Sequence, residues 1–209
     1  MIHFQNSGAT SAHDKPAIFV DADGVLWQDV GPGSALGLSE LPRSTIDVLR
    51  QIRESTSGAC RLIVVTNQTC VARGLCSEKT LTDKLCDLLL TPQGVDSIYV
   101  CLHHPSASVS NYRKVCTCRK PQPGMFLAAS QIEKLVLASS VIVGDRITDL
   151  MAASRAGVRK MFLISHERSL QLNEMSPTQI RDNESIVFSV VNSLVEIDWP
   201  RQNLASVGN

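Results

Sequence analysis

Residues 17–25 read AIFVDADGV, and this stretch decides the fold. Four apolar residues stop abruptly at Asp21, and a second carboxylate, Asp23, and a glycine, Gly24, follow. A short continuous apolar run is typical of a strand that is buried on both faces of a parallel sheet. The glycine allows the chain to turn sharply away from that sheet. The stretch therefore predicts a central strand with two acidic side chains at its carboxyl end.

On either side of this stretch, apolar runs alternate with segments of helical character. Further buried strands are predicted over 61–65, 97–100, 141–143 and 160–164. Helices are predicted over 42–54, 77–90, 123–136, 147–156 and 186–196, with Ser77 as an N-cap and Pro123 at a helix start. This alternation predicts an α/β fold, a Rossmann-like parallel sheet with helices on both faces and right-handed crossovers.

The length and composition favour a single domain. A chain of 209 residues that is 44% hydrophobic can bury one substantial core. Polar, aperiodic ends predict a flexible arm over 1–14 and a flexible tail over 201–209, with the domain over 15–200 between them. The intervals 21–66 and 66–120 are taken up by elements that cover the sheet, which leaves no room for a large cap domain.

Charge and hydropathy restrict the partners. Twenty basic residues balance twenty acidic ones, so no overall field draws the protein to nucleic acid or to an anionic membrane. The first twenty residues lack the pattern of a leader, and no apolar run approaches the roughly 18 residues of a membrane span. We expect a soluble, cytoplasmic monomer that acts on a small molecule, with no nucleic-acid or membrane partner.

Polar residues that follow the apolar runs should meet in one crevice. Ligands of such sheets bind beyond the carboxyl ends of the strands. Carboxylates there suit a metal ion, hydroxyl and amide groups can donate to phosphoryl oxygens, and the neighbouring cations Arg119 and Lys120 can pair with a phosphate dianion. The candidates at the strand ends are Asp21, Asp23, Thr66, Asn67, Gln68, Asp145 and Arg146.

Each of these motifs alone has a simpler interpretation. The two aspartates could cap a turn, residues 66–68 could be a plain end of a strand, and Arg119 and Lys120 could be solvated surface cations. Asp149 could be a favourable charge at a helix N-terminus. A calcium loop is excluded, because it needs a glutamate at its twelfth position, which is Pro32 when the count starts at Asp21.

A compact cysteine and histidine pattern indicates a metal site rather than disulfides. Three thiolates and one imidazole form a soft, four-coordinate set that suits a closed, structural Zn²⁺ site. The predicted ligands are Cys101, His103, Cys116 and Cys118, whereas His104 is given no ligand role. Cys60, Cys70, Cys76 and Cys86 are expected to be ordinary reduced thiols.

The order of the motifs resembles the haloacid dehalogenase superfamily of phosphatases. DADGV over 21–25, TNQ over 66–68, RKP over 119–121 and GDRITD over 144–149 follow one another as they do in that superfamily. The segments CLHHP over 101–105 and VCTCRKPQPGM over 115–125 resemble the zinc loop of the D-glycero-D-manno-heptose 1,7-bisphosphate phosphatases. Histidinol-phosphate phosphatases carry a similar loop. The resemblance covers about residues 17–164.

The resemblance implies a role for each motif residue. Asp21 would be the nucleophile that forms an aspartyl-phosphate, and Asp23 would protonate the leaving oxygen and then activate water. Mg²⁺ would be held by the carboxylates of Asp21 and Asp145 and by the Asp23 backbone carbonyl. The phosphoryl group and the rest of the substrate would be bound by Thr66, Asn67, Gln68, Arg119, Lys120 and Arg146.

Two departures from the family pattern bear on the substrate. Arg146 stands where the heptose enzymes usually have lysine, and residues 27–41 lack their tyrosine-containing segment and are rich in glycine. The leading hypothesis is removal of one phosphate from a heptose bisphosphate in heptose biosynthesis. The alternatives are a phosphatase of histidinol phosphate or another small sugar phosphate, a silent relative that binds phosphorylated ligands, and a zinc-dependent interaction module.

Overall fold

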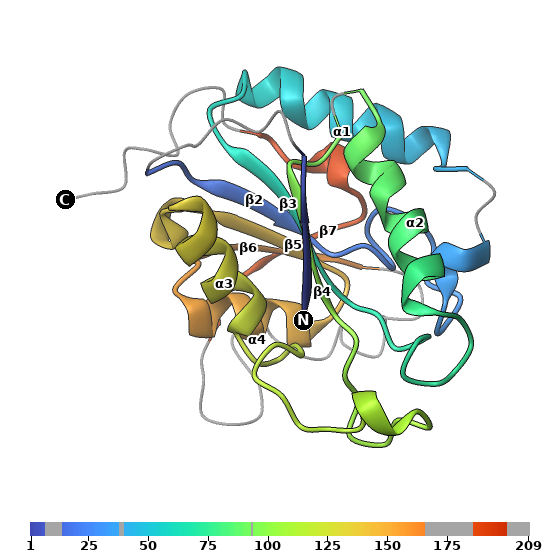
Figure 1. Cartoon of the computed structure of the whole chain (residues 1–209). Coiled ribbons are helices and arrows are strands. Elements are labelled where there is room, and N and C mark those ends of the chain that lie inside the picture. Colours follow the sequence, from blue (N-terminus) through green and yellow to red (C-terminus); the bar gives the residue numbers. More distant parts are fainter. Residues whose placement is uncertain (7–13, 38–39, 93, 166–185, 200–209) are drawn as a thin grey trace.

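The computed structural model describes residues 1–6, 14–37, 40–92, 94–165 and 186–199. Within these ranges seven strands form one sheet in the order β1-β4-β3-β2-β5-β6-β7 (Figure 1). Only β1 runs antiparallel to its neighbour; the other pairings are parallel. The strands are β1 Ile2–Gln5, β2 Ala17–Val20, β3 Arg61–Asn67, β4 Ser97–Cys101, β5 Val141–Gly144, β6 Lys160–Ile164 and β7 Ser189–Val191.

Helices cover both faces of this sheet. The α-helices are α1 Arg43–Thr56, α2 Glu78–Leu90, α3 Gly124–Glu133 and α4 Ile147–Ala156. Short 3-10 helices lie at Ser34–Gly37, Ser110–Tyr112, Leu137–Ser139 and Leu194–Glu196. In Figure 1, α1 and α2 lie on one face of the sheet and α3 and α4 on the other. Within the ranges above, no helix combines the length and apolar character needed to cross a lipid bilayer.

Alternate residues of the central strands supply two cores. In β2, Ile18 and Val20 belong to the core under α1 and α2, whereas Ala17 and Phe19 belong to the core under α3 and α4. All four side chains are fully buried. Burial on both faces explains why the strand is continuously apolar instead of alternating with polar residues.

The register of the central strands brings the polar residues after them to one edge. Val20 of β2 lies opposite Val64 of β3 and Val143 of β5. The Asp21 backbone N–H then donates to the Val143 carbonyl at 3.0 Å. The carboxyl ends of β2, β3 and β5 therefore open onto the same crevice.

The fold class expected from the sequence, a parallel α/β sheet without a large cap domain, is confirmed for the described residues. β2 and β6 have the predicted bounds, and the other predicted strands are longer by one or two residues. Ser77 caps α2 as expected, since its hydroxyl accepts a hydrogen bond from the Thr80 backbone N–H at 3.0 Å. α4 also has its predicted bounds.

Three local predictions are wrong. The helix expected over 186–196 is instead β7 followed by a 3-10 turn, because β-branched valines favour the strand that pairs with β6. The arm expected over 1–14 contains β1, which pairs with the open edge of β4. α3 ends at Glu133 rather than at 136, since Lys134 takes a left-handed conformation. The tail expected over 201–209 lies outside the described residues.

A buried charge network joins the sheet to α3. The Glu133 carboxylate accepts hydrogen bonds from Arg61 of β3 at 2.9 and 3.0 Å. The hydroxyl groups of Ser97 and Tyr99, both on β4, donate to its other oxygen. Arg61 also pairs with Asp96 at 3.3 Å. Both charges are therefore matched by fixed partners, as buried charges must be.

We predict that Glu133→Leu destabilises the protein, because it leaves the buried Arg61 guanidinium with Asp96 as its remaining acidic partner. Breaking a buried pair from one side costs roughly 3 kcal/mol of unfolding free energy. Urea unfolding followed by circular dichroism measures this loss. Asp83→Ala, which breaks the exposed Lys79–Asp83 pair, should leave the midpoint almost unchanged. Equal effects of the two variants would contradict a structural role for the buried network.

Candidate active site

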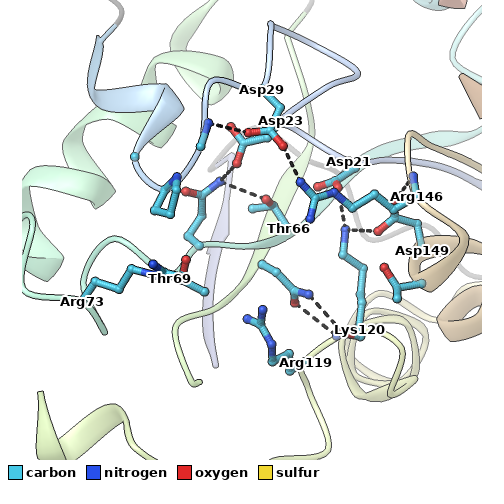
Figure 2. A pocket seen from close by; sticks show the side chains of 16 residues that line it. Asp21, Asp23, Asp29, Thr66, Thr69, Arg73, Arg119, Lys120, Arg146 and Asp149 are labelled. Atoms are coloured by element: carbon cyan, nitrogen blue, oxygen red, sulfur yellow. Dashed lines mark hydrogen bonds and ion pairs between the residues drawn. The ribbon is translucent and has the colours of Figure 1, made fainter. Parts of the chain in front are cut away.

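A polar pocket of about 360 Å³ lies beyond the carboxyl ends of β2 and β3. Figure 2 shows acidic side chains on one side of it and the cations Arg73 and Arg119 on another. The pocket is lined by eight of the residues proposed from the sequence: Asp21, Asp23, Thr66, Asn67, Gln68, Arg119, Lys120 and Arg146. The expected convergence of residues far apart in the chain is thus present in the structure.

Lys120 is the buried centre of this pocket. Its Nζ lies 2.9 Å from Asp21 Oδ2 and 2.7 Å from Asp149 Oδ1, and it donates to the Val65 carbonyl at 2.9 Å. Three acceptors match the three N–H groups of an ammonium. Burial alone would lower the pKa of Lys120, but the charges of Asp149 and Asp21 outweigh burial and raise that pKa above its usual value. Lys120 is therefore a permanent cation.

The carboxylates around Lys120 carry more negative charge than it neutralises. Burial raises the pKa of Asp21 to about 7, although Lys120 opposes this shift. Burial and the charge of Asp149 raise the pKa of Asp145 to about 6. Carboxylate oxygens of Asp21, Asp145 and Asp149 lie within 4.8 Å of one another. This arrangement favours a bound cation.

Asp145 offers the clearest metal-binding atom. Its Oδ1 is buried and has no hydrogen-bond partner among the described residues. Asp149, in contrast, is engaged through both oxygens, by Lys120 and by the Arg146 backbone N–H at 3.0 Å. An all-oxygen set suits Mg²⁺ rather than a softer metal. The residues present therefore fit Mg²⁺ held by Asp21 and Asp145.

Gly24 lets the chain pass directly over Asp145. Its φ is +79°, and a Cβ added there would lie 2.2 Å from Asp145 Oδ2. Such a contact is far below van der Waals distance, so only glycine leaves the carboxylate in place. The glycine of the DADG motif is thus part of the metal site's geometry.

Asp23 is held by two donors. The Trp27 indole donates to Asp23 Oδ1 at 2.6 Å, and the Gln68 amide donates to Asp23 Oδ2 at 2.7 Å. Gln68 also donates to Thr66 Oγ1 at 3.1 Å. Burial raises the pKa of Asp23, and the hydrogen bonds from Trp27 and Gln68 partly offset that rise. Burial thus favours the protonated carboxyl that a proton donor requires.

Asn67 supports Lys120 from its backbone side. The Asn67 side chain donates to the Lys120 carbonyl at 3.2 Å and accepts from the Lys120 N–H at 3.1 Å. Because the amide oxygen and one amide N–H both bind the backbone of Lys120, Asn67 positions Lys120. Arg119, which directly precedes Lys120, donates to the His103 carbonyl at 3.2 Å.

Arg146 lies at the mouth of the pocket. Its side chain is 64% exposed and pairs with Asp29. Asp29 in turn accepts from the Gly31 backbone N–H at 2.8 Å. Asp29, Thr69 and Arg73 also line the pocket, although their places in the sequence did not predict it. Asp29 follows no apolar strand, so its position in the sequence gave no signal.

The four predicted zinc ligands form a second cluster. The Sγ atoms of Cys101, Cys116 and Cys118 lie 3.3, 3.4 and 3.7 Å apart. His103 Nδ1 lies 3.3 Å from Cys118 Sγ and 3.9 Å from Cys101 Sγ. A tetrahedral zinc about 2.3 Å from each sulfur would place the sulfurs about 3.8 Å apart. The hydrogen bond with Cys101 lowers the pKa of Cys118 to about 4, so the cluster already favours a thiolate and is compatible with zinc.

Sequence comparison finds relatives among the heptose bisphosphate phosphatases. The HAD-hydrolase-like family profile matches residues 117–183. The chain is 40% identical over 158 residues to the D-glycero-beta-D-manno-heptose-1,7-bisphosphate 7-phosphatase of Escherichia coli O6:H1 (strain CFT073). That alignment covers 73% of this chain and 81% of the relative.

Solved structures agree with this similarity. A D,D-heptose 1,7-bisphosphate phosphatase from B. bronchiseptica, complexed with magnesium and phosphate, matches with a TM-score of 0.64 and 30% identity. The match covers 86% of this chain and 94% of that one. A putative HAD-like phosphatase from Mesorhizobium loti matches with a TM-score of 0.71 and 24% identity, over 96% of this chain and 95% of that one, which supports the fold.

We predict that Gly24→Ala weakens Mg²⁺ binding, because the new methyl group must displace the Asp145 carboxylate. Isothermal titration calorimetry should show a loss of roughly tenfold or more in affinity, the size seen when a ligand's support is removed. Gly58→Ala is the matched control, since Gly58 has a similar φ of +71° but nothing within 4 Å of the added Cβ. Unchanged affinity in Gly24→Ala would show that Asp145 does not bind the ion.

Proposed function

Since this chain belongs to the haloacid dehalogenase-like phosphatases, we propose that it removes the 7-phosphate of a heptose 1,7-bisphosphate through an aspartyl-phosphate on Asp21. The observation that carries the proposal is the position of Asp21. Its side chain lies at the end of the central strand, is 10% exposed, and is bound by the buried Lys120. A nucleophile in that position meets a phosphate that enters the pocket from its open side.

Asp21 and Asp23 divide the chemistry between them. An Asp21 oxygen attacks phosphorus, the bond to the sugar oxygen breaks, and that oxygen keeps the electron pair and takes the proton of Asp23. Asp23, now a carboxylate, then accepts a proton from water as the water attacks the phosphorus of the aspartyl-phosphate. The bond between phosphorus and the Asp21 oxygen breaks, which releases phosphate and restores the Asp21 carboxylate. Two moderate barriers replace one high barrier.

The metal supplies charge neutralisation when it is bound. Asp21, Asp145 and the Asp23 carbonyl would hold Mg²⁺, which would screen the repulsion between an anionic nucleophile and an anionic substrate. The unpartnered Oδ1 of Asp145 supports this assignment. Lys120 meanwhile keeps Asp21 and Asp149 in place without needing to move.

The rest of the pocket suits the substrate's remaining anionic group. Thr66 lines the pocket together with Asp21 and has a hydroxyl that can donate to the transferred phosphoryl group. Arg73, Arg119 and Arg146 also line the pocket. A bisphosphate would present its second phosphate to such cations. The names of the relatives described above support a heptose as the sugar.

We further propose that zinc at Cys101, His103, Cys116 and Cys118 is structural. Four protein ligands close the coordination sphere, so this metal has no position for activating water. Cys118 directly precedes Arg119 and Lys120. A fixed loop therefore holds two cations of the pocket at the orientation that phosphate requires.

Phosphate release from the purified protein with Mg²⁺ tests the proposed function. We predict preferential hydrolysis of one anomer of heptose 1,7-bisphosphate over histidinol phosphate and hexose phosphates. We also predict that Asp21→Asn loses turnover on every substrate, because the amide cannot act as the nucleophile. Asp83→Asn, an exposed change on α2, should keep full activity.

The outcomes separate chemistry from specificity. Full activity of Asp21→Asn would overturn the aspartyl-phosphate mechanism. Preference for histidinol phosphate would keep the mechanism and replace the heptose, whereas no release from any compound would favour a protein that only binds phosphorylated ligands.

We predict that Cys118→Ser lowers the zinc content and reduces activity, because a serine hydroxyl is a poor ligand for zinc. Mass spectrometry of bound metal and phosphate release measure the two effects. Cys86→Ser, on α2 and outside the cluster, should keep both at wild-type values. An unchanged zinc content in Cys118→Ser would refute the proposed ligand set.

A further inference from the structure

Trp27 makes a hydrogen bond to Asp23, and the proposed mechanism assigns Trp27 no role. Its indole N–H donates to the Asp23 carboxyl at 2.6 Å, and the ring is 7% exposed. We propose that Trp27 is a positioning residue for Asp23. Its N–H occupies the protein-facing side of one carboxyl oxygen, so the acidic proton of Asp23 points toward the leaving group. This inference rests on the proposed function, in which Asp23 is the acid.

A tight turn returns the chain from Asp23 to Trp27. The Leu26 N–H donates to the Ala22 carbonyl at 2.8 Å, and the Gly24 N–H donates to the Trp27 carbonyl at 2.7 Å. Asp23 and Trp27 also form an isolated β-bridge. The backbone therefore sets the indole beside the carboxyl before any ligand binds.

The packing of the ring keeps it there. Trp27 belongs to the hydrophobic core under α1 and α2, together with Leu26 and Val48. A ring held in a packed core has little rotamer freedom. Its N–H consequently has a fixed direction, and the Asp23 carboxyl must orient to meet it.

The chemistry of the donor explains why tryptophan suits this position. An indole N–H can only donate, and it cannot accept a proton from the carboxyl. Gln68 approaches the other oxygen with its amide N–H, at 2.7 Å. With a donor on each oxygen, the acidic proton must occupy a remaining lone pair, and Asp23 lines the pocket. The proton is thus directed to where the leaving oxygen lies.

The affected step is the first one. The phosphorus–oxygen bond to the alcohol breaks, the alcohol oxygen keeps the electron pair, and the Asp23 proton moves to that oxygen. An alcohol is a poor leaving group and needs this proton, whereas p-nitrophenolate leaves readily without it. A defect in the acid therefore slows sugar phosphates more than p-nitrophenyl phosphate. General damage to the pocket would slow both.

The test compares Trp27→Phe with the wild-type protein on heptose 1,7-bisphosphate and p-nitrophenyl phosphate. We expect kcat to fall roughly tenfold or more for the sugar phosphate and about twofold or less for p-nitrophenyl phosphate. The KM values should stay within about twofold, because the ground-state contacts remain. Trp199→Phe is the matched control, since Trp199 is also buried but its Nε1 has no hydrogen-bond partner among the described residues.

A second variant separates the N–H group from the ring. Site-specific replacement of Trp27 by β-(3-benzothienyl)alanine exchanges the N–H for sulfur and keeps the shape of the ring. This variant can be measured even if Trp27→Phe does not fold. The same selective loss for the sugar phosphate is expected. Equal losses of kcat on both compounds, or no loss on either, would overturn the role of Trp27 and leave the proposed function standing. A wild-type protein that hydrolyses neither compound would overturn the proposed function and this inference with it.

Discussion

The burial of one ammonium group constrains the whole site. Lys120 is 3% exposed, and a buried cation is tolerated only when each N–H has an acceptor. The acceptors come from the end of β2, the backbone of β3 and the first turn of α4. The parallel pairing of β2 with β3 and β5 brings these three elements together at Lys120, so the charge cluster depends on the fold.

Around this fixed cation, the structure separates rigid support from reacting groups. The cysteine and histidine cluster adjoins the segment that carries Arg119 and Lys120, and Asn67 binds its backbone, while Asp21 and Asp23 line the pocket. Burial raises the pKa of Asp21 and of Asp145, and the charge of Asp149 adds to both shifts. A divalent cation would remove this excess of negative charge. The clustered carboxylates therefore cost folding stability at the place where a cation would bind, as is common at functional sites.

Sequence patterns were reliable where one local rule dominates. The continuous apolar runs identified the parallel strands, because burial on both faces leaves no alternative composition. They failed where pairing with a distant strand decides the outcome: Ile2–Gln5 and Ser189–Val191 are strands because β4 and β6 have edges open to them. Asp29 and Trp27 were not assigned roles in the site for a related reason, since a long-range ion pair and a tight turn bring them there.

The sequence by itself determined the fold class, the convergence of the strand-end residues on one pocket and the four members of the cysteine and histidine cluster. The first two follow from local composition combined with the rule that parallel strands end at the same edge of a sheet, and the cluster follows from the type and spacing of its residues. Only the tertiary structure decided which partner each side chain takes: Asn67 binds the backbone of Lys120, Asp149 binds its ammonium, and Trp27 binds Asp23. The choice of partner depends on the exact relative positions of segments that are far apart in the chain. A linear sequence does not contain these positions.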